Sequence, residues 1–267
     1  MAAGLSGCGG GGSSTPGGGG PSPTPQSLAI TPGTSMLRVD QTEVFTGTLT
    51  LSNGQSQQAQ PTWQSDNITV LTFEGGNVAR GRSNGTATII ASSQGVTATR
   101  LVRVFNNFHG TWEGDYVLRR CEETGDFRGL DFCDREDGFY VGEILPVAMI
   151  LRQQADAITG DFHLGGLEGT TSGAVGSNGR YTGVANITVT DDSATVAFAV
   201  QPLDLNVEGD RLTGTFTVTV TIPGLSGHGR FDAQLQTVVR IDDGAQPLRV
   251  GTRPVGGFKA ALDALRR

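Results

Sequence analysis

The stretch Thr215–Ile222, with the sequence TFTVTVTI, alternates strictly between polar and apolar side chains. Phe216, Val218, Val220 and Ile222 occupy every second position, and threonines occupy the positions between them. Successive side chains of a strand point to opposite faces of a sheet. The period of two therefore predicts a β-strand with one face in an apolar core and the other in water.

Residues 108–243, which contain this stretch, have the same texture throughout and predict about eight strands. The candidate strands are Gly110–Arg119, Glu143–Gln153, Ala157–Leu164, Gly169–Val175, Arg180–Thr190, Thr195–Leu205, Arg211–Ile222 and Gly229–Ile241. Short connections favour an up-and-down antiparallel β-barrel, because closure removes unpaired strand edges. A membrane barrel would need aromatic girdles on its outer face, and this segment has only one tryptophan and three tyrosines. We therefore expect a water-soluble barrel with its apolar face inward.

Residues 27–105, which precede the barrel, also consist of short alternating runs separated by turn residues. Asn53-Gly54 lies between two such runs, and this dipeptide is typical of a tight hairpin turn. About seven strands in this segment predict an antiparallel sandwich. The predicted fold class is therefore all-β, with a β-sandwich followed by a β-barrel.

The composition of the 267-residue chain agrees with about two domains and excludes several classes of protein. Its formal net charge of −7 would repel phosphates, so no nucleic-acid partner is expected. Charged residues make up 17% and glycines number 41, which is unlike a coiled coil. No apolar run reaches about 18 residues, so no transmembrane helix is predicted.

The segment Leu5–Cys8, with the sequence LSGC, resembles the bacterial lipobox. The resemblance implies lipidation of Cys8, a membrane partner through this N-terminal anchor, and a place in the bacterial cell envelope, at the outer membrane or cell surface. Residues 1–8 are interpreted as the remnant of a truncated signal peptide; the alternative is a chance cysteine in a glycine-rich leader. Residues 9–26 are rich in glycine, serine and proline, which predicts a disordered tether.

Four sequence blocks in residues 27–105 resemble a group 2 bacterial immunoglobulin-like (Ig-like) domain. They are Leu28-x-Ile30-x-Pro32, Pro61-Thr62-Trp63-x-Ser65-Asp66-Asn67-x-x-Val70, Gly76-Asn77-Val78-Ala79-x-Gly81 and Gly85-Thr86-Ala87-Thr88-Ile89-x-Ala91. This family is found in surface proteins of the intimin and invasin type and has no catalytic chemistry. The resemblance implies an Ig-like sandwich that offers a site for a protein or carbohydrate partner. We expect Trp63 to be the buried tryptophan of this sandwich.

The run Phe108–Gly114, FHGTWEG, resembles the Gly-x-Trp pattern of lipocalins and the wider calycin group. The resemblance implies structural roles for Gly110 and for Trp112, which would close the floor of the barrel. Arg240, on the last predicted strand, is a candidate for packing on this tryptophan. A lipocalin-like barrel would also allow a small hydrophobic ligand inside. Residues 244–267 form a C-terminal extension with a short predicted helix near its end.

Cys121 and Cys133 remain once Cys8 is assigned to lipid, and they lie within one acidic loop. An even pair in an extracytoplasmic protein predicts a disulfide. Zinc is disfavoured because the three histidines of the chain have no ligand spacing, and no metal is expected. The loop itself is interpreted as a solvated, stapled segment, with a lid over the barrel or a weak cation site as alternatives.

The sequence contains no Gly-x-Ser-x-Gly, phosphate-loop or His-Glu-x-x-His motif, so we expect no enzyme and no cofactor. Two functions follow: a surface adhesion or interaction module, or a carrier of a small hydrophobic ligand. They differ in the barrel interior. Large side chains that fill it leave no room for a ligand; these are Phe162, Phe198, Phe216 and Phe231.

Overall fold

The computed structural model describes residues 22–33, 36–135, 138–190 and 195–241. The lipobox cysteine Cys8, most of the predicted tether and the whole of residues 244–267, with the predicted helix, lie outside the described residues. The described part of the chain is all-β, as the sequence predicts, and contains one short 3₁₀ helix, η1 (Gly125–Leu130). No helix of the described part is long and apolar enough to cross a membrane.

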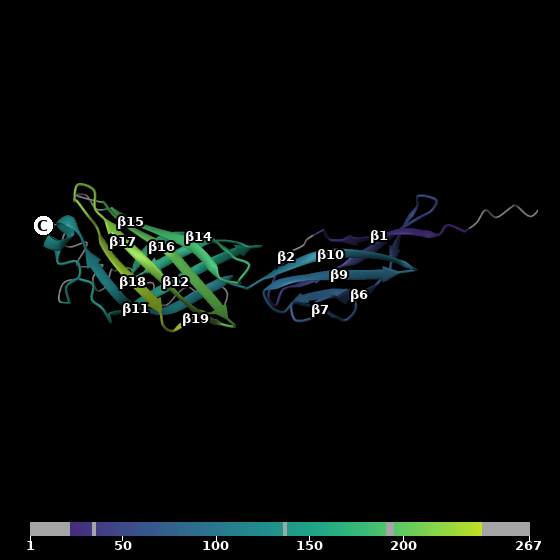
Figure 1. Ribbon diagram of the computed structural model, residues 1–267, viewed down its shortest axis with the longest axis horizontal. Coiled ribbons are helices and arrows are strands. Elements are labelled where there is room, and N and C mark those ends of the chain that lie inside the picture. Colours follow the sequence, from purple (N-terminus) through teal and green to yellow (C-terminus); the bar gives the residue numbers. More distant parts are fainter. Residues whose placement is uncertain (1–21, 34–35, 136–137, 191–194, 242–267) are drawn as a thin grey trace, which may run out of the picture.

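The N-terminal domain consists of ten short strands in three sheets around one core (Figure 1). The first sheet contains β1 (Pro25–Thr31), β4 (Thr46–Leu51) and β5 (Ser56–Ala59); the second contains β2 (Met36–Arg38), β10 (Val96–Phe105), β9 (Gly85–Ser93) and β6 (Thr62–Ser65); the third contains β3 (Thr42–Val44), β8 (Val78–Gly81) and β7 (Leu71–Glu74). β1 begins at Pro25, so it includes the last two residues of the predicted tether, which ends at residue 26.

Two details of this domain differ from the sequence-based expectation of about seven antiparallel strands. The domain has ten strands, and β2 pairs with β10 in parallel, with Met36 opposite Arg103 and Arg38 opposite Phe105. Alternation of apolar residues predicts which face of a strand is buried, but it says nothing about the direction of the neighbouring strand. The pattern therefore could not reveal a parallel pair.

The core of the N-terminal domain includes an aromatic group of Phe45, Trp63 and Phe73. The Trp63 ring stacks on Phe73 at a centroid distance of 5.7 Å and lies 6.1 Å from Phe45. Trp63 is only half-buried, whereas Phe45 is fully buried. The expectation of a buried tryptophan is wrong in this respect: Trp63 packs against the core but is only partly buried, and its strand β6 lies at the edge of its sheet.

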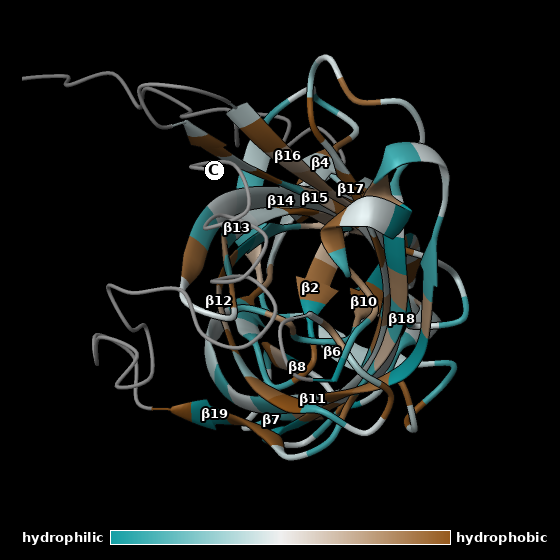
Figure 2. Cartoon of the chain, turned by 90° about the vertical axis from the view of Figure 1, so that its left-hand side faces the viewer, coloured by the Kyte–Doolittle hydropathy of each residue, from teal (hydrophilic) through white to brown (hydrophobic). Residues whose placement is uncertain are grey.

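The C-terminal domain is a closed barrel of eight antiparallel strands. In order they are β12 (Ile144–Gln154), β13 (Ala157–Leu164), β14 (Leu167–Val175), β15 (Tyr181–Thr190), β16 (Thr195–Glu208), β17 (Arg211–Thr221), β18 (Gly229–Leu235) and β11 (Gly110–Glu123), and β11 pairs with β12 to close the ring. Figure 2 shows these strands around a common axis. The predicted meander closed into a barrel is confirmed.

The last strand of the barrel is interrupted. β18 and β19 (Val238–Ile241) both lie between β11 and β17, so they are two halves of one strand. At the break, Gln236 N donates to Asp115 O at 2.9 Å. A Cβ added to Gly114 would lie 1.9 Å from Thr237 O, so only glycine fits beneath the break.

Residues 215–221 of the stretch TFTVTVTI form the end of β17, and Ile222 follows the strand directly. Phe216, Val218, Val220 and Ile222 are all buried, and the intervening threonines are exposed or half-buried. The alternation therefore predicts both the strand and its buried face. The two domains follow one another along the long axis of the molecule (Figure 1).

Candidate functional site

The end of the barrel next to the N-terminal domain is closed by Trp112 and Arg240. Trp112 is fully buried, and its Nε1 donates to Phe108 O at 2.8 Å. The guanidinium carbon of Arg240 lies 4.5 Å from the centroid of the Trp112 ring. Its Nη2 donates to Asn107 O at 2.8 Å, and Nη1 donates to His109 O. Arg240 thus binds the chain that enters the barrel while covering the tryptophan.

Gly110 begins β11 directly after these carbonyls. Its φ of 127° lies in the region that side chains with a Cβ rarely adopt. Each of the three residues singled out from the Gly-x-Trp pattern and the last strand therefore lies at this end of the barrel.

The interior of the barrel is occupied by aromatic and aliphatic side chains. Phe162, Phe198, Phe216 and Phe231 are at most 2% exposed. Phe216 lies 5.1 Å from Tyr116 and 6.2 Å from Phe162, measured between ring centroids. These rings take the space in which a lipocalin-like carrier would hold its ligand.

The opposite end of the barrel is covered by the acidic loop. The predicted disulfide is confirmed: Cys121 in β11 is bonded to Cys133, with Cα atoms 5.7 Å apart. The segment between the two cysteines contains η1. A chain of ring contacts runs from this loop into the barrel, through Phe127, Phe132, Phe139 and Phe231 at centroid distances of 5.8, 5.0 and 4.7 Å. We call Phe127, Phe132 and Phe139 the aromatic plug.

The aromatic plug shows that the loop is more than a solvated, stapled segment, because its three phenylalanines are at most 4% exposed. Two acidic side chains around it accept hydrogen bonds from backbone N–H groups. Asp126 Oδ2 accepts from Ser226 N at 2.7 Å, which lowers the pKa of Asp126. Glu123 Oε2 accepts from Cys133 N at 3.0 Å. Within the described residues, no group of three potential metal ligands is found.

The barrel core contains buried tyrosine hydroxyl groups. Tyr116 is fully buried, and its hydroxyl has no hydrogen-bond partner among the described residues. Burial, with a further contribution from the negative charge of Glu143, raises the pKa of Tyr116 well above its usual value. Tyr181 is also buried, but its hydroxyl lies 2.9 Å from Thr171 Oγ1.

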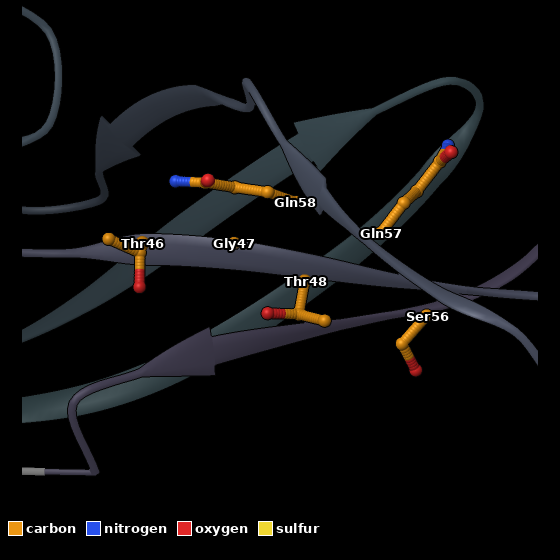
Figure 3. Close-up of a pocket in the computed structure, with 6 residues that line it drawn as sticks. All are labelled: Thr46, Gly47, Thr48, Ser56, Gln57 and Gln58. Atoms are coloured by element: carbon orange, nitrogen blue, oxygen red, sulfur yellow. The ribbon is translucent and has the colours of Figure 1, made fainter.

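A shallow hollow of about 280 Å³ lies on the hairpin of β4 and β5 (Figure 3). Neutral residues line it: Thr46, Gly47, Thr48, Ser56, Gln57 and Gln58. The side chains of Gln57 and Gln58 extend in different directions in Figure 3. Because no titratable group lines this hollow, it offers little chemistry.

The junction between the two domains is held by amide side chains. Asn84 Nδ2 donates to Ser177 O at 3.0 Å, and Asn106 Nδ2 donates to Gly179 O at 2.9 Å. Buried Gln153 accepts from Phe108 N at 2.9 Å and donates to the carbonyl groups of Asn106 and Ala155. The chain between the domains is thus hydrogen-bonded to the barrel on both sides.

A cleft of about 460 Å³ lies beside this junction. The N-terminal domain lines it with Gly33, Met36, Leu37, Arg38 and Gln41, and the barrel lines it with Gln153, Gln154 and Ala155. We refer to it as the interdomain cleft.

Sequence reasoning missed both the junction and the interdomain cleft. One signal was present: Gln153 follows Val147, Met149 and Leu151 at intervals of two, so a polar residue occupies the apolar face of its strand. A buried amide needs partners. Here the partners come from the interdomain chain.

The fold and the sites described above define a two-domain all-β protein with a filled, closed barrel. No protein-family model matches the chain, and no curated protein matches it. Among solved structures, domains 5–6 of the S-layer protein SbsC are similar to this chain at 14% identity with a TM-score of 0.28. The match covers 84% of this chain and 100% of that one. A likeness of this size carries no argument about function.

Proposed function

We propose that this protein is a non-enzymatic lipoprotein of the bacterial cell envelope that acts as a surface-displayed adhesion or interaction module. The observation that carries the proposal is that the barrel is filled inside and covered at both ends. Its interior is filled by large side chains, one end is covered by Arg240 and Trp112, and the other end is covered by the aromatic plug. A domain built in this way suits rigid display better than carriage.

The anchor and the family relationships belong to the same proposal. The LSGC segment supports lipidation at Cys8, with the outer membrane or the cell surface as the location. The parallel β2–β10 pair and the three small sheets are compatible with a group 2 Ig-like domain. The contact of Arg240 with Trp112 supports a lipocalin-like barrel. The disulfide fits an oxidising compartment.

The anchor is tested by expressing the chain behind a full signal sequence and feeding labelled palmitate. We expect label in the wild type and none in Cys8→Ala, with protease accessibility on intact cells only for the wild type. The Cys121→Ser/Cys133→Ser variant is the matched control, because it removes two cysteines and keeps Cys8. Label that persists in Cys8→Ala would contradict the proposed anchor.

The alternative, carriage of a small hydrophobic ligand, is tested on the same preparation. Native mass spectrometry of the purified protein is expected to give the mass of the polypeptide with no bound species, before and after addition of fatty acids. A lipid bound at one molecule per chain would favour the carrier and count against the proposal.

A further inference from the structure

The interdomain cleft combines a guanidinium group with several amides. Arg38 and Gln41 come from the N-terminal domain, and Gln153 and Gln154 come from the barrel. Met36, which is 44% exposed, supplies an apolar wall. Such a mixture of a cation, neutral hydrogen-bonding groups and an apolar surface is typical of a site for a small polar ligand, and the volume lies in the usual range.

Arg38 is a cation without a counter-charge. Its Nη1 is buried and has no hydrogen-bond partner, and no carboxylate of the described chain lies within ion-pairing distance. A buried N–H of a charged group that lacks an acceptor is costly. In contrast, Arg80, Arg82 and Arg180 each pair with a carboxylate.

A second unpaired guanidinium lies on the same face of the sheet. Arg103 is opposite Met36 in the parallel β2–β10 register, and its guanidinium carbon lies 4.6 Å from the centroid of the Phe105 ring. Among residues 22–33, 36–135, 138–190 and 195–241, it too has no carboxylate partner. Positive charge is therefore concentrated beside the interdomain cleft of an acidic protein.

The walls of the cleft are held in place by the rest of the fold. Gln41 Oε1 accepts from Arg38 N at 3.0 Å, which keeps the Gln41 amide beside Arg38. Leu37 is buried in the core of the N-terminal domain, and Gln153 is fixed by its three hydrogen bonds. A ligand that binds here need not order these groups, so little affinity is lost to rearrangement.

We propose that the interdomain cleft binds a saccharide that carries a carboxylate, such as a uronic acid. The Arg38 guanidinium matches a carboxylate in charge and geometry. The primary amides of Gln41 and Gln154 donate and accept hydrogen bonds, as the hydroxyl groups of a sugar require, whereas Gln153 already uses both of its N–H groups within the protein. An extended peptide fits less well, because the edge strand β2 has only three residues with which to pair. The proposal rests on the proposed function, for which it names a ligand class.

The test is an NMR titration of the full chain with sodium D-glucuronate, with D-glucose, acetate and a diglutamate peptide as comparison probes. We expect saturable shifts at residues 36–41 and 153–155 with glucuronate, weaker binding of acetate, and none of glucose. Arg38→Gln should weaken glucuronate binding by about tenfold or more, and Arg38→Lys should retain part of it. Arg128→Gln, an exposed arginine in η1, is the matched control and should bind as the wild type does.

Three results would overturn the proposal: no saturable shifts with glucuronate, equal binding by Arg38→Gln and wild type, or tighter binding of acetate or of the peptide than of glucuronate. The amide spectrum of each variant shows directly whether it is folded. Failure here leaves palmitate labelling of Cys8 unaffected, so it is distinguishable from failure of the proposed function.

Discussion

At the scale of single residues, a few polar groups decide how the barrel ends and how its core responds to pH. Arg240 makes several contacts at once, because its guanidinium covers the Trp112 ring and donates hydrogen bonds to two carbonyl groups. Tyr116 does the opposite, since it carries a hydroxyl into the core without a partner among the described residues. For both residues, substitutions that change the polar group and largely keep the side-chain volume test the contribution of that group to stability.

We expect Arg240→Lys to lower the free energy of unfolding by about 2–3 kcal/mol, because an ammonium group cannot bind Asn107 O and His109 O while stacking on Trp112. Urea unfolding followed by tryptophan fluorescence measures the change. The matched control is Arg211→Lys, an exposed arginine at the start of β17, which should change stability by less than about 0.5 kcal/mol. Equal effects of the two substitutions would contradict the assigned role.

Tyr116 predicts a loss of stability at alkaline pH. Its pKa in the folded protein is raised above the usual value of 10.0, so the folded state retains a proton that the unfolded state releases above about pH 10. The contribution of Tyr116 to stability is therefore complete below that pH and declines as the pH rises further. The free energy of unfolding of Tyr116→Phe should therefore fall less steeply between about pH 10 and 12 than that of the wild type.

At neutral pH, Tyr116→Phe should leave stability unchanged or raise it by up to about 1 kcal/mol, because no hydrogen bond among the described residues is lost. Tyr181→Phe is the comparison variant: it loses the hydrogen bond with Thr171 and should destabilise the protein at neutral pH. Chemical unfolding at a series of pH values checks both statements. If the free energy of unfolding falls as steeply between about pH 10 and 12 in Tyr116→Phe as in the wild type, the role assigned to Tyr116 at alkaline pH is wrong.

At the scale of elements, the acidic loop is the clearest case of a segment whose role changed between sequence and structure. The charges suggested a hydrated loop, but Phe127, Phe132 and Phe139 turn inward and close the barrel. The disulfide joins the end of β11 to the middle of this loop. In the folded state it thereby keeps the loop that carries Phe127 and Phe132 close to β11.

The Cys121→Ser/Cys133→Ser variant is expected to lose about 3 kcal/mol of stability, since the bond closes a short loop in the unfolded chain. It should also bind a hydrophobic dye such as ANS more strongly, because the aromatic plug opens more often. Cys8→Ser, which keeps the disulfide, is the control and should show neither effect. Unchanged stability of the double variant would mean that the plug is held by packing alone.

At the scale of the whole molecule, the two domains are joined by a packed and hydrogen-bonded junction rather than by a free linker. Phe105 ends the last strand of the N-terminal domain, yet it is buried in the core of the barrel together with Phe108. The amides of Asn84 and Asn106 reach Ser177 and Gly179 on the barrel. The resulting unit presents both domains in one arrangement, which is what rigid display requires.

Gly179→Ala is expected to loosen this junction. A Cβ at this position would lie 2.7 Å from Asn106 Nδ2, and the backbone has a φ of +78°. Gly209→Ala is the matched control, because Gly209 also has a positive φ, +60°, but a Cβ there would meet nothing within 4 Å. Both should lose about 1 kcal/mol of stability through backbone strain.

Only Gly179→Ala should broaden the distribution of distances between spin labels on the two domains, as measured by pulsed EPR. The same distribution in both alanine variants would show that the hydrogen bond from Asn106 does not hold the domains.

Much of the fold could be read from local pattern. The alternation in Thr215–Ile222 predicted a strand and its buried face, and the eight candidate strands close into the barrel. The cysteine pair predicted the disulfide. Trp63 shows the limit: its type suggested burial, but its place on the edge strand β6 leaves it half-buried.

The division has a physical reason. Some signals act over short stretches of chain: the period of the side chains, the turn residues and the pairing of nearby cysteines. These signals predicted the β class, the barrel strands and the disulfide from the sequence alone. The parallel β2–β10 pair, the inward turn of the aromatic plug and the interdomain cleft each depend on residues that are distant in sequence. Arg38 and Gln153 are more than a hundred positions apart, and only the packing of two domains makes them two walls of one cleft.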